Sequence, residues 1–170
     1  MTSMLPNAFF YTLSTIAQAL AAAIALLSAF VLYRLQVLRT EIDEDSQQIA
    51  GLYGGQIDSM ASSDAIRALH RQTKYAGVLD FVTTHPIPAG VYKAEVERAR
   101  LAANLRYQTK LLLTFGIALG QTVLLIAASV SALAAAAGVE LWLVSILRFA
   151  VGWFVICLIN YAYLAKLALK

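Results

Sequence analysis

The sequence predicts an all-α integral membrane protein with three transmembrane helices, the first two of which extend into a cytoplasmic helical hairpin. Of its 170 residues, 60% are hydrophobic and 14% are charged, whereas a soluble domain carries roughly 25% charged residues. Three long segments are almost free of charge, and most of the charge lies between the first two. Residues 141–164 contain one charge, Arg148, and about 20 apolar residues suffice to cross ~30 Å of hydrocarbon.

The apolar segments predict the domain boundaries. Neither 1–33 nor 111–139 contains an Asp, Glu, Lys, Arg or His. We expect transmembrane helices over residues 8–33, 111–136 and 141–165, and a cytoplasmic helical region over residues 34–110. The N-terminus lacks the Lys or Arg with which a secretory signal peptide begins, so the first helix is expected to be retained.

The distribution of basic residues predicts the orientation. Of the 13 Lys and Arg residues, ten lie between the first two spans, and Lys166 and Lys170 follow the third. The N-terminal segment and the link around Gly138 contain none. Because positive residues accumulate on the cytoplasmic side, we expect a multi-pass protein of the cell inner membrane with its N-terminus outside and its C-terminus in the cytoplasm.

The cytoplasmic region is predicted to be helical. Apolar residues recur there at helical spacings: Leu35, Leu38, Ile42, Ile49 and Leu52. The first helix is therefore expected to continue beyond the membrane and to end near residues 54–55. Its start is expected at an N-cap, Asn7. Residues 62–64, Ser-Ser-Asp, suggest the N-cap of a second helix over about 64–75. The prolines within residues 84–90 break the pattern, and a third helical pattern leads from residue 92 into the second span.

Arg148 is the first candidate for an intramembrane function, because an arginine within an apolar span is costly. Three roles remain open. In the first, its side chain extends outward to lipid phosphates or Glu140. In the second, it hydrogen-bonds Gln18, Gln121 or helix-end carbonyls inside the bundle. The third role is to line a water-filled pathway and set its charge preference.

Other polar residues share the predicted face of Arg148. Gly152 and Asn160, like Arg148, fall within about 60° of Ser145 on a helix. Such a face fits either a packed interface or a pore lining. Gln18 and Gln121 give the first and second spans one amide each, and single intramembrane amides more often join helices than conduct ions.

Small residues form stripes on the first two spans. Gly116 and Gly120 make a GxxxG pair, and alanines recur every four residues on the first span: Ala17, Ala21, Ala25 and Ala29. Close contact at small residues drives helix association in lipid. Two interpretations stand, packing within one protomer or contacts between protomers.

No pattern predicts catalysis, a metal or a cofactor. His70 and His85 have no further ligand at metal-binding spacing. The single cysteine, Cys157, allows no intramolecular disulfide and is expected to be a small buried apolar residue. The pair Arg67 and His70 is interpreted as surface charge, and the acidic residues within 41–45 as a solvated helix face offset by basic residues of the returning helix. Nucleic acid is not an expected partner, because topology explains the basic residues.

These patterns lead to two functional hypotheses. The first is a non-enzymatic, homo-oligomeric membrane protein, which would include an ion-conducting pore lined by the polar face of the third helix. The alternative is a membrane-anchored adaptor or effector whose cytoplasmic helical hairpin binds a protein partner. The lipid bilayer is a partner in both.

Overall fold

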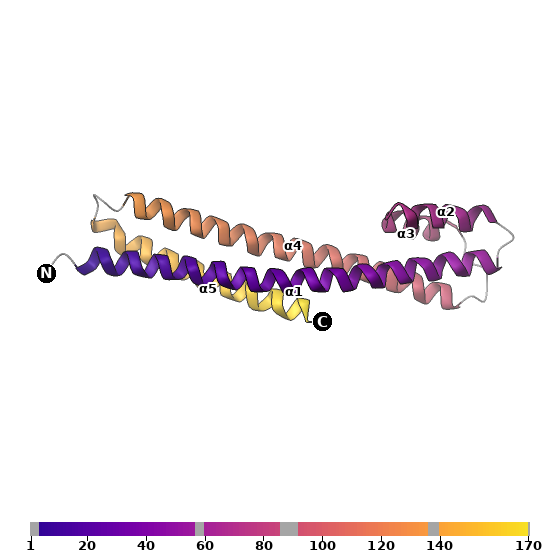
Figure 1. Ribbon diagram of the computed structural model, residues 1–170, viewed down its shortest axis with the longest axis horizontal. Coiled ribbons are helices and arrows are strands. Elements are labelled where there is room, and N and C mark those ends of the chain that lie inside the picture. Colours follow the sequence, from indigo (N-terminus) through magenta and orange to yellow (C-terminus); the bar gives the residue numbers. More distant parts are fainter. Residues whose placement is uncertain (1–3, 57–59, 86–91, 136–139, 170) are drawn as a thin grey trace. The chain divides into compact units, whose positions relative to one another are not determined.

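The computed structural model describes residues 4–56, 60–85, 92–135 and 140–169, and within them it contains five α-helices and no strand. The helices are α1 (Met4–Gln56), α2 (Met60–Arg71), α3 (Tyr75–Thr84), α4 (Tyr92–Ala135) and α5 (Glu140–Ala168), as labelled in Figure 1. The prediction of an all-helical chain is confirmed for these residues.

Three of the helices are long and apolar enough to cross a membrane: α1, α4 and α5. They contain 53, 44 and 29 residues. At about 1.5 Å per residue, even the shortest exceeds the ~30 Å of a hydrocarbon core. The chain is therefore compatible with a multi-pass membrane protein, as the apolar runs predicted.

The chain divides into two compact units. One consists of Met1–Leu32 with Leu111–Lys170, and we call it the apolar unit. The other is Tyr33–Lys110, and we call it the charged unit. These divisions lie next to the change in composition, since Arg34 is the first charged residue of the chain and Lys110 the last before the second apolar segment.

In the apolar unit, each long helix buries one narrow face. The buried residues of α1, α4 and α5 recur mainly at intervals of three, four and seven, the spacing at which helices pack side by side. They are Leu13, Ile16, Leu20, Ile24 and Val31 on α1, Leu111, Ala118, Thr122, Leu125 and Ser129 on α4, and Ala150, Cys157, Tyr161, Leu164 and Leu167 on α5. Cys157 is a fully buried free thiol, as predicted.

The charged unit has a hydrophobic core of its own. Ile49 of α1, Ile66 of α2, Val78 of α3 and Leu101 of α4 are fully buried in one cluster. The rings of Tyr53 and Phe81 meet edge to face with their centroids 6.4 Å apart. Four helices thus contribute to a single core, and Ile42 and Ile49 of the apolar seam predicted beyond residue 33 belong to it.

The short helices differ from the prediction. One helix was expected over 64–75, starting after an N-cap at residues 62–64. The structure has two, and Ser63 lies inside the first of them as a buried residue. Asn7 likewise lies within α1, which begins at Met4, so its prediction as N-cap is wrong. The predicted end of α1 near residues 54–55 agrees with Gln56, and residues 86–91 of the proline segment lie outside the described residues.

A left-handed residue separates α2 from α3. Thr73 has φ 56°, a conformation uncommon for any residue but glycine and costly for a β-branched one. Its N–H bonds to the carbonyl of His70 at 2.8 Å, and the N–H of Lys74 bonds to that of Leu69 at 3.0 Å. This pair of bonds is the Schellman ending of a helix. No glycine stands at the turn, so the sequence carried no signal for it.

Candidate functional site

Two neighbouring polar pairs join α4 to α5 in the apolar unit. The Asn160 Nδ2 donates to Gln121 Oε1 at 2.6 Å. One residue further along each helix, the hydroxyls of Thr122 and Tyr161 share a hydrogen bond. The Thr122 hydroxyl also lies 2.7 Å from the carbonyl oxygen of Ala118. Asn160 and Gln121, both predicted as polar intramembrane candidates, therefore contact each other.

These pairs act as contacts between helices. Each is formed by neutral groups that satisfy each other, and hydrogen bonds of this kind stabilise membrane helix pairs by roughly 0.6 to 2 kcal/mol. The short bond engages the Asn160 amide with a partner on its own protomer. Of the alternatives left open for the amides, the structure supports helix packing.

The same bonds fix the level of Arg148 in the bundle. Only residues 136–139 connect α4 to α5, so helices that meet at Gln121 and Asn160 must run antiparallel. Arg148 precedes Asn160 by twelve residues, about 18 Å of helix, and Gln121 precedes the end of α4 at Ala135 by about 21 Å. Arg148 thus lies within about one helical turn of the level at which α4 ends.

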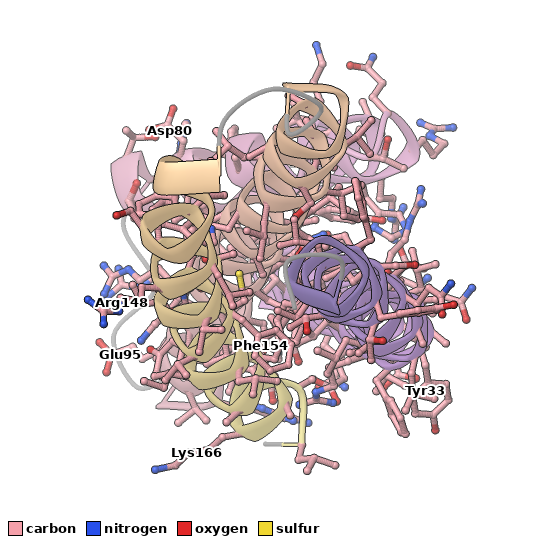
Figure 2. The ribbon with its side chains drawn as sticks, turned by 90° about the vertical axis from the view of Figure 1, so that its left-hand side faces the viewer. Tyr33, Asp80, Glu95, Arg148, Phe154 and Lys166 are labelled. Carbon is pink, nitrogen blue, oxygen red and sulfur yellow. The ribbon has the colours of Figure 1, made fainter. Side chains whose placement is uncertain are left out.

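The polar face that includes Arg148 points out of the packed helices. Arg148, Ser145 and Gly152 are all exposed, and Figure 2 shows the Arg148 side chain extending outward from α5. Among the described residues, no hydrogen bond or ion pair reaches its guanidinium group; the side chain of Glu140 lies outside them. Gln18 is exposed on α1. Within the apolar unit the structure brings together Asn160 and Gln121 but not Arg148, Ser145 and Gln18.

The small-residue stripes also face outward. A Cβ added to Gly116 or to Gly120 would have no atom within 4 Å. On α1, Ala21, Ala25 and Ala29 are exposed, and Ala17 is half-buried. Gly116, Gly120 and three of the four alanines therefore lie outside the buried faces of the apolar unit, and Ala17 lies at the margin of one.

The charged unit buries two carboxylates between α1 and α4. The side chains of Asp45 and Glu97 are 3% and 6% exposed, and the guanidinium of Arg100 lies 4.0 Å from the first and 3.4 Å from the second. Asn104 Nδ2 donates to Asp45 Oδ2 at 3.0 Å. Burial raises the pKa of Asp45 above its usual value, although Arg100 and Asn104 oppose the shift.

A second polar cluster connects α1 to α2 and α3. His70 Nδ1 lies 3.2 Å from the hydroxyl of the fully buried Ser46, and its Nε2 lies 3.6 Å from Asp43 Oδ1. The Tyr75 hydroxyl donates to the same Asp43 oxygen at 2.9 Å. Burial and the bond to Asp43 raise the pKa of Tyr75.

These clusters correct two predictions. Arg67 is exposed and lies near Asp64, as surface charge should, but His70 is partly buried in a hydrogen-bonded cluster. The acidic residues of 41–45 do not form a uniformly solvated face, because Asp45 is buried. The available signal was position: Asp45 and Ser46 fall midway between the apolar seam residues at 42 and 49 and so share their face.

The arrangement joins helices through hydrogen bonds and ion pairs. In the described residues, no three His, Cys, Asp or Glu side chains gather as metal ligands. No protein-family model matches the chain, and neither a curated protein nor a solved structure matches it.

Proposed function

We propose that the chain is a non-enzymatic, homo-oligomeric inner-membrane protein that self-associates through the outward faces of α1 and α4. The observation that carries this proposal is the position of its small residues. Gly116 and Gly120 face open space, and the α1 alanines are mostly exposed. In the proposed layout, the N-terminus lies outside, and residues 34–110 form a cytoplasmic helical hairpin.

Lipid chains supply no hydrophobic drive for helices to associate, so small residues that permit close backbone approach are used at contacts. The three helices of one protomer pack through leucines, Thr122 and Tyr161 instead. The glycines and alanines are therefore available for a second protomer. Since helix formation itself disfavours glycine by about 1 kcal/mol relative to alanine, two glycines in one exposed helical face have a cost that close contact would offset.

A pore is a more specific form of this proposal. Because Ser145, Arg148 and Gly152 are exposed on α5, several protomers would have to place these faces around one axis. The amides of Asn160 and Gln121 bond each other within a protomer, which removes one polar group from such a lining.

The second candidate function is a membrane-anchored adaptor, and the core of the charged unit favours it. Residues of α1, α2, α3 and α4 enclose that core, so the unit has an ordered surface of its own to present to a protein partner. An adaptor needs no shared axis at Arg148. The two functions are compatible, because self-association would gather several such surfaces.

Gly120→Leu tests the proposed self-association. A Cβ at this position meets no atom beyond the local backbone, Gly120 is exposed and leucine favours helix, so the fold should be retained. We expect self-association in lipid nanodiscs to weaken by at least about tenfold, which corresponds to about 1.4 kcal/mol. Single-molecule photobleaching and crosslinking in vesicles would measure it.

Ala162→Leu is the matched control, because Ala162 is also exposed but lies on α5, away from the proposed contact faces of α1 and α4. It should leave self-association unchanged. A wild-type chain that is monomeric in lipid, or equal effects of the two leucines, would contradict the proposal.

A further inference from the structure

The charged unit contains an open cavity of about 550 Å³ between α1, the α2–α3 turn, the start of α3, and α4. Its lining combines two cations, three neutral polar groups and an apolar floor. In that order, these residues are Arg39 and Lys74, then Thr73, Tyr75 and Gln108, and finally Ile42, Ala76, Gly77 and Leu105. Among the described residues, no carboxylate lines it.

The two cations at the cavity are not neutralised. Arg34, Arg67 and Arg100 each form an ion pair with an acidic residue. By contrast, neither Arg39 nor Lys74 forms an ion pair with any of the residues that the structure describes, and both are exposed. The cavity therefore has a local excess of positive charge, although the charged unit as a whole contains many acids.

A neighbouring hollow differs from this cavity in its charge. It measures about 460 Å³ and shares Arg39, Thr73 and Tyr75, but Asp43 also lines it. The Asp43 carboxylate, which accepts the Tyr75 hydroxyl, would repel an anion there. Charge thus distinguishes two adjacent hollows, and only the larger suits a negative ligand.

The apolar floor specifies the kind of anion. Ile42 is fully buried, but Leu105 and Ala76 keep accessible surface, so a ligand over these two residues would contact hydrocarbon on one side and two cations on the other. A free inorganic anion gains nothing from the floor. A phosphate attached to glycerol and acyl chains would use both.

The position along the chain matches the depth of lipid headgroups. Arg39 lies six residues, about 9 Å of helix, beyond Tyr33, and Gln108 lies two residues, about 3 Å, before Lys110. In the proposed layout both helices leave the hydrocarbon at these boundary residues. The headgroup layer is about 5–8 Å thick, so Gln108 would lie within it and Arg39 just beyond it, where its long side chain can extend back to a headgroup.

We infer that the cavity binds the phosphate headgroup of an anionic membrane phospholipid, with Lys74 and Arg39 as its cationic contacts. The inference rests on the membrane layout of the proposed function but not on self-association. Basic pockets on the cytoplasmic side of membrane proteins bind anionic headgroups. Each Lys or Arg near the membrane surface adds about the same free energy of attraction to anionic lipid.

The test is a titration of the purified full chain in detergent with dioctanoyl phosphatidylglycerol, read by native mass spectrometry. We expect Lys74→Gln to weaken binding about fivefold. Lys74 is the better residue to change, because Arg39 also lines the neighbouring hollow with Asp43. Gln108→Glu, which places a negative charge in the same cavity, should weaken binding at least as much.

Lys93→Gln is the matched control, because it removes an exposed lysine of the same unit that does not line the cavity. It should leave binding unchanged. Equal losses in Lys74→Gln and Lys93→Gln would overturn the inference, as would equal binding of dioctanoyl phosphatidylcholine. Inorganic phosphate that binds as tightly as the lipid would show a free-anion site and overturn it too.

The oligomeric state in the same spectra separates this inference from self-association. If the wild type is monomeric but the Lys74→Gln loss persists, self-association fails and the lipid site stands. If Gly120→Leu alone disperses the oligomer and no variant alters lipid binding, the lipid site fails.

Discussion

The two units of the chain bury polar groups in different ways. In the apolar unit, the polar pairs between α4 and α5 are neutral: a half-buried amide with an amide, and a buried hydroxyl with a hydroxyl. In the charged unit, two carboxylates are buried beside Arg100, whose side chain is 59% exposed. The first unit satisfies polar groups without charge, and the second buries charge at an edge that reaches solvent.

The surroundings explain this difference. Removing an ion from water costs several kcal/mol even after relaxation, and a close partner offsets this cost only with good geometry. Arg100 can remain hydrated while it contacts Asp45 and Glu97, so the charged unit keeps part of that solvation. A helix surrounded by hydrocarbon offers no such edge, and neutral pairs there avoid the cost. This contrast is what a membrane boundary between the units would produce.

Asn160→Asp should have the largest effect on this comparison. The change keeps the shape of the side chain but adds a charge beside Gln121. An aspartate within a span costs about 2.5–3.5 kcal/mol on insertion scales, and a loss of that order is expected in the free energy of unfolding measured in bicelles.

Gln47→Glu is the corresponding change in the charged unit, at an exposed position near His70. Its effect should stay within about 0.5 kcal/mol, as for most surface substitutions. Equal losses in the two variants would mean that the surroundings of Asn160 and Gln47 do not differ as proposed.

Asp45→Asn should stabilise the charged unit at neutral pH. Burial raises the pKa of Asp45 above its usual 3.8, so its contribution to stability is complete below that value and is lost as pH rises through the folded pKa. Asparagine has no such loss and retains an oxygen to accept from Asn104. The advantage of the variant should therefore grow with pH.

Urea unfolding of the full chain, followed by circular dichroism, gives the free energy of unfolding of variant and wild type. It is measured from below the usual pKa of Asp45 to neutral pH. Titrations of other carboxylates largely cancel in that difference. A variant that is less stable at neutral pH would mean that the attraction of Arg100 outweighs the desolvation of Asp45.

Arg148→Gln should have the smallest effect. The side chain is exposed near the level at which α4 ends, so it can extend to water or phosphate, and stability should change by less than about 0.5 kcal/mol. Arg148→Lys should behave alike. Planar-bilayer recordings add a second measurement: a change of reversal potential in Arg148→Gln, but not in Arg148→Lys, with the oligomer intact, would favour the pore.

The sequence by itself determined how many long apolar helices exist and where the charge lies along them. These are local properties, because the length of an apolar run does not depend on the residues that pack against it. The ends of α1 near residue 56 and of α4 near residue 135 followed from composition alone, and so did the burial of Cys157. The break between α2 and α3 did not, since it depends on Thr73 adopting a conformation that its side chain disfavours.

The tertiary structure decided which face of each helix is covered. Every candidate residue of the spans was polar or small, and nothing local distinguishes Asn160, which meets Gln121, from Ser145, which meets no other helix. The buried positions of α4 show the reason: 94, 101, 122 and 129, and likewise 97, 111, 118 and 125, differ by multiples of seven. Glu97, Thr122 and Ser129 interrupt this repeat with polar side chains and conceal it in the sequence. For Asp45 the spacing from Ile42 and Ile49 marks the face, but burial depends on residues that arrive from elsewhere in the chain, so only the packed helices show that Arg100 and Asn104 meet its carboxylate.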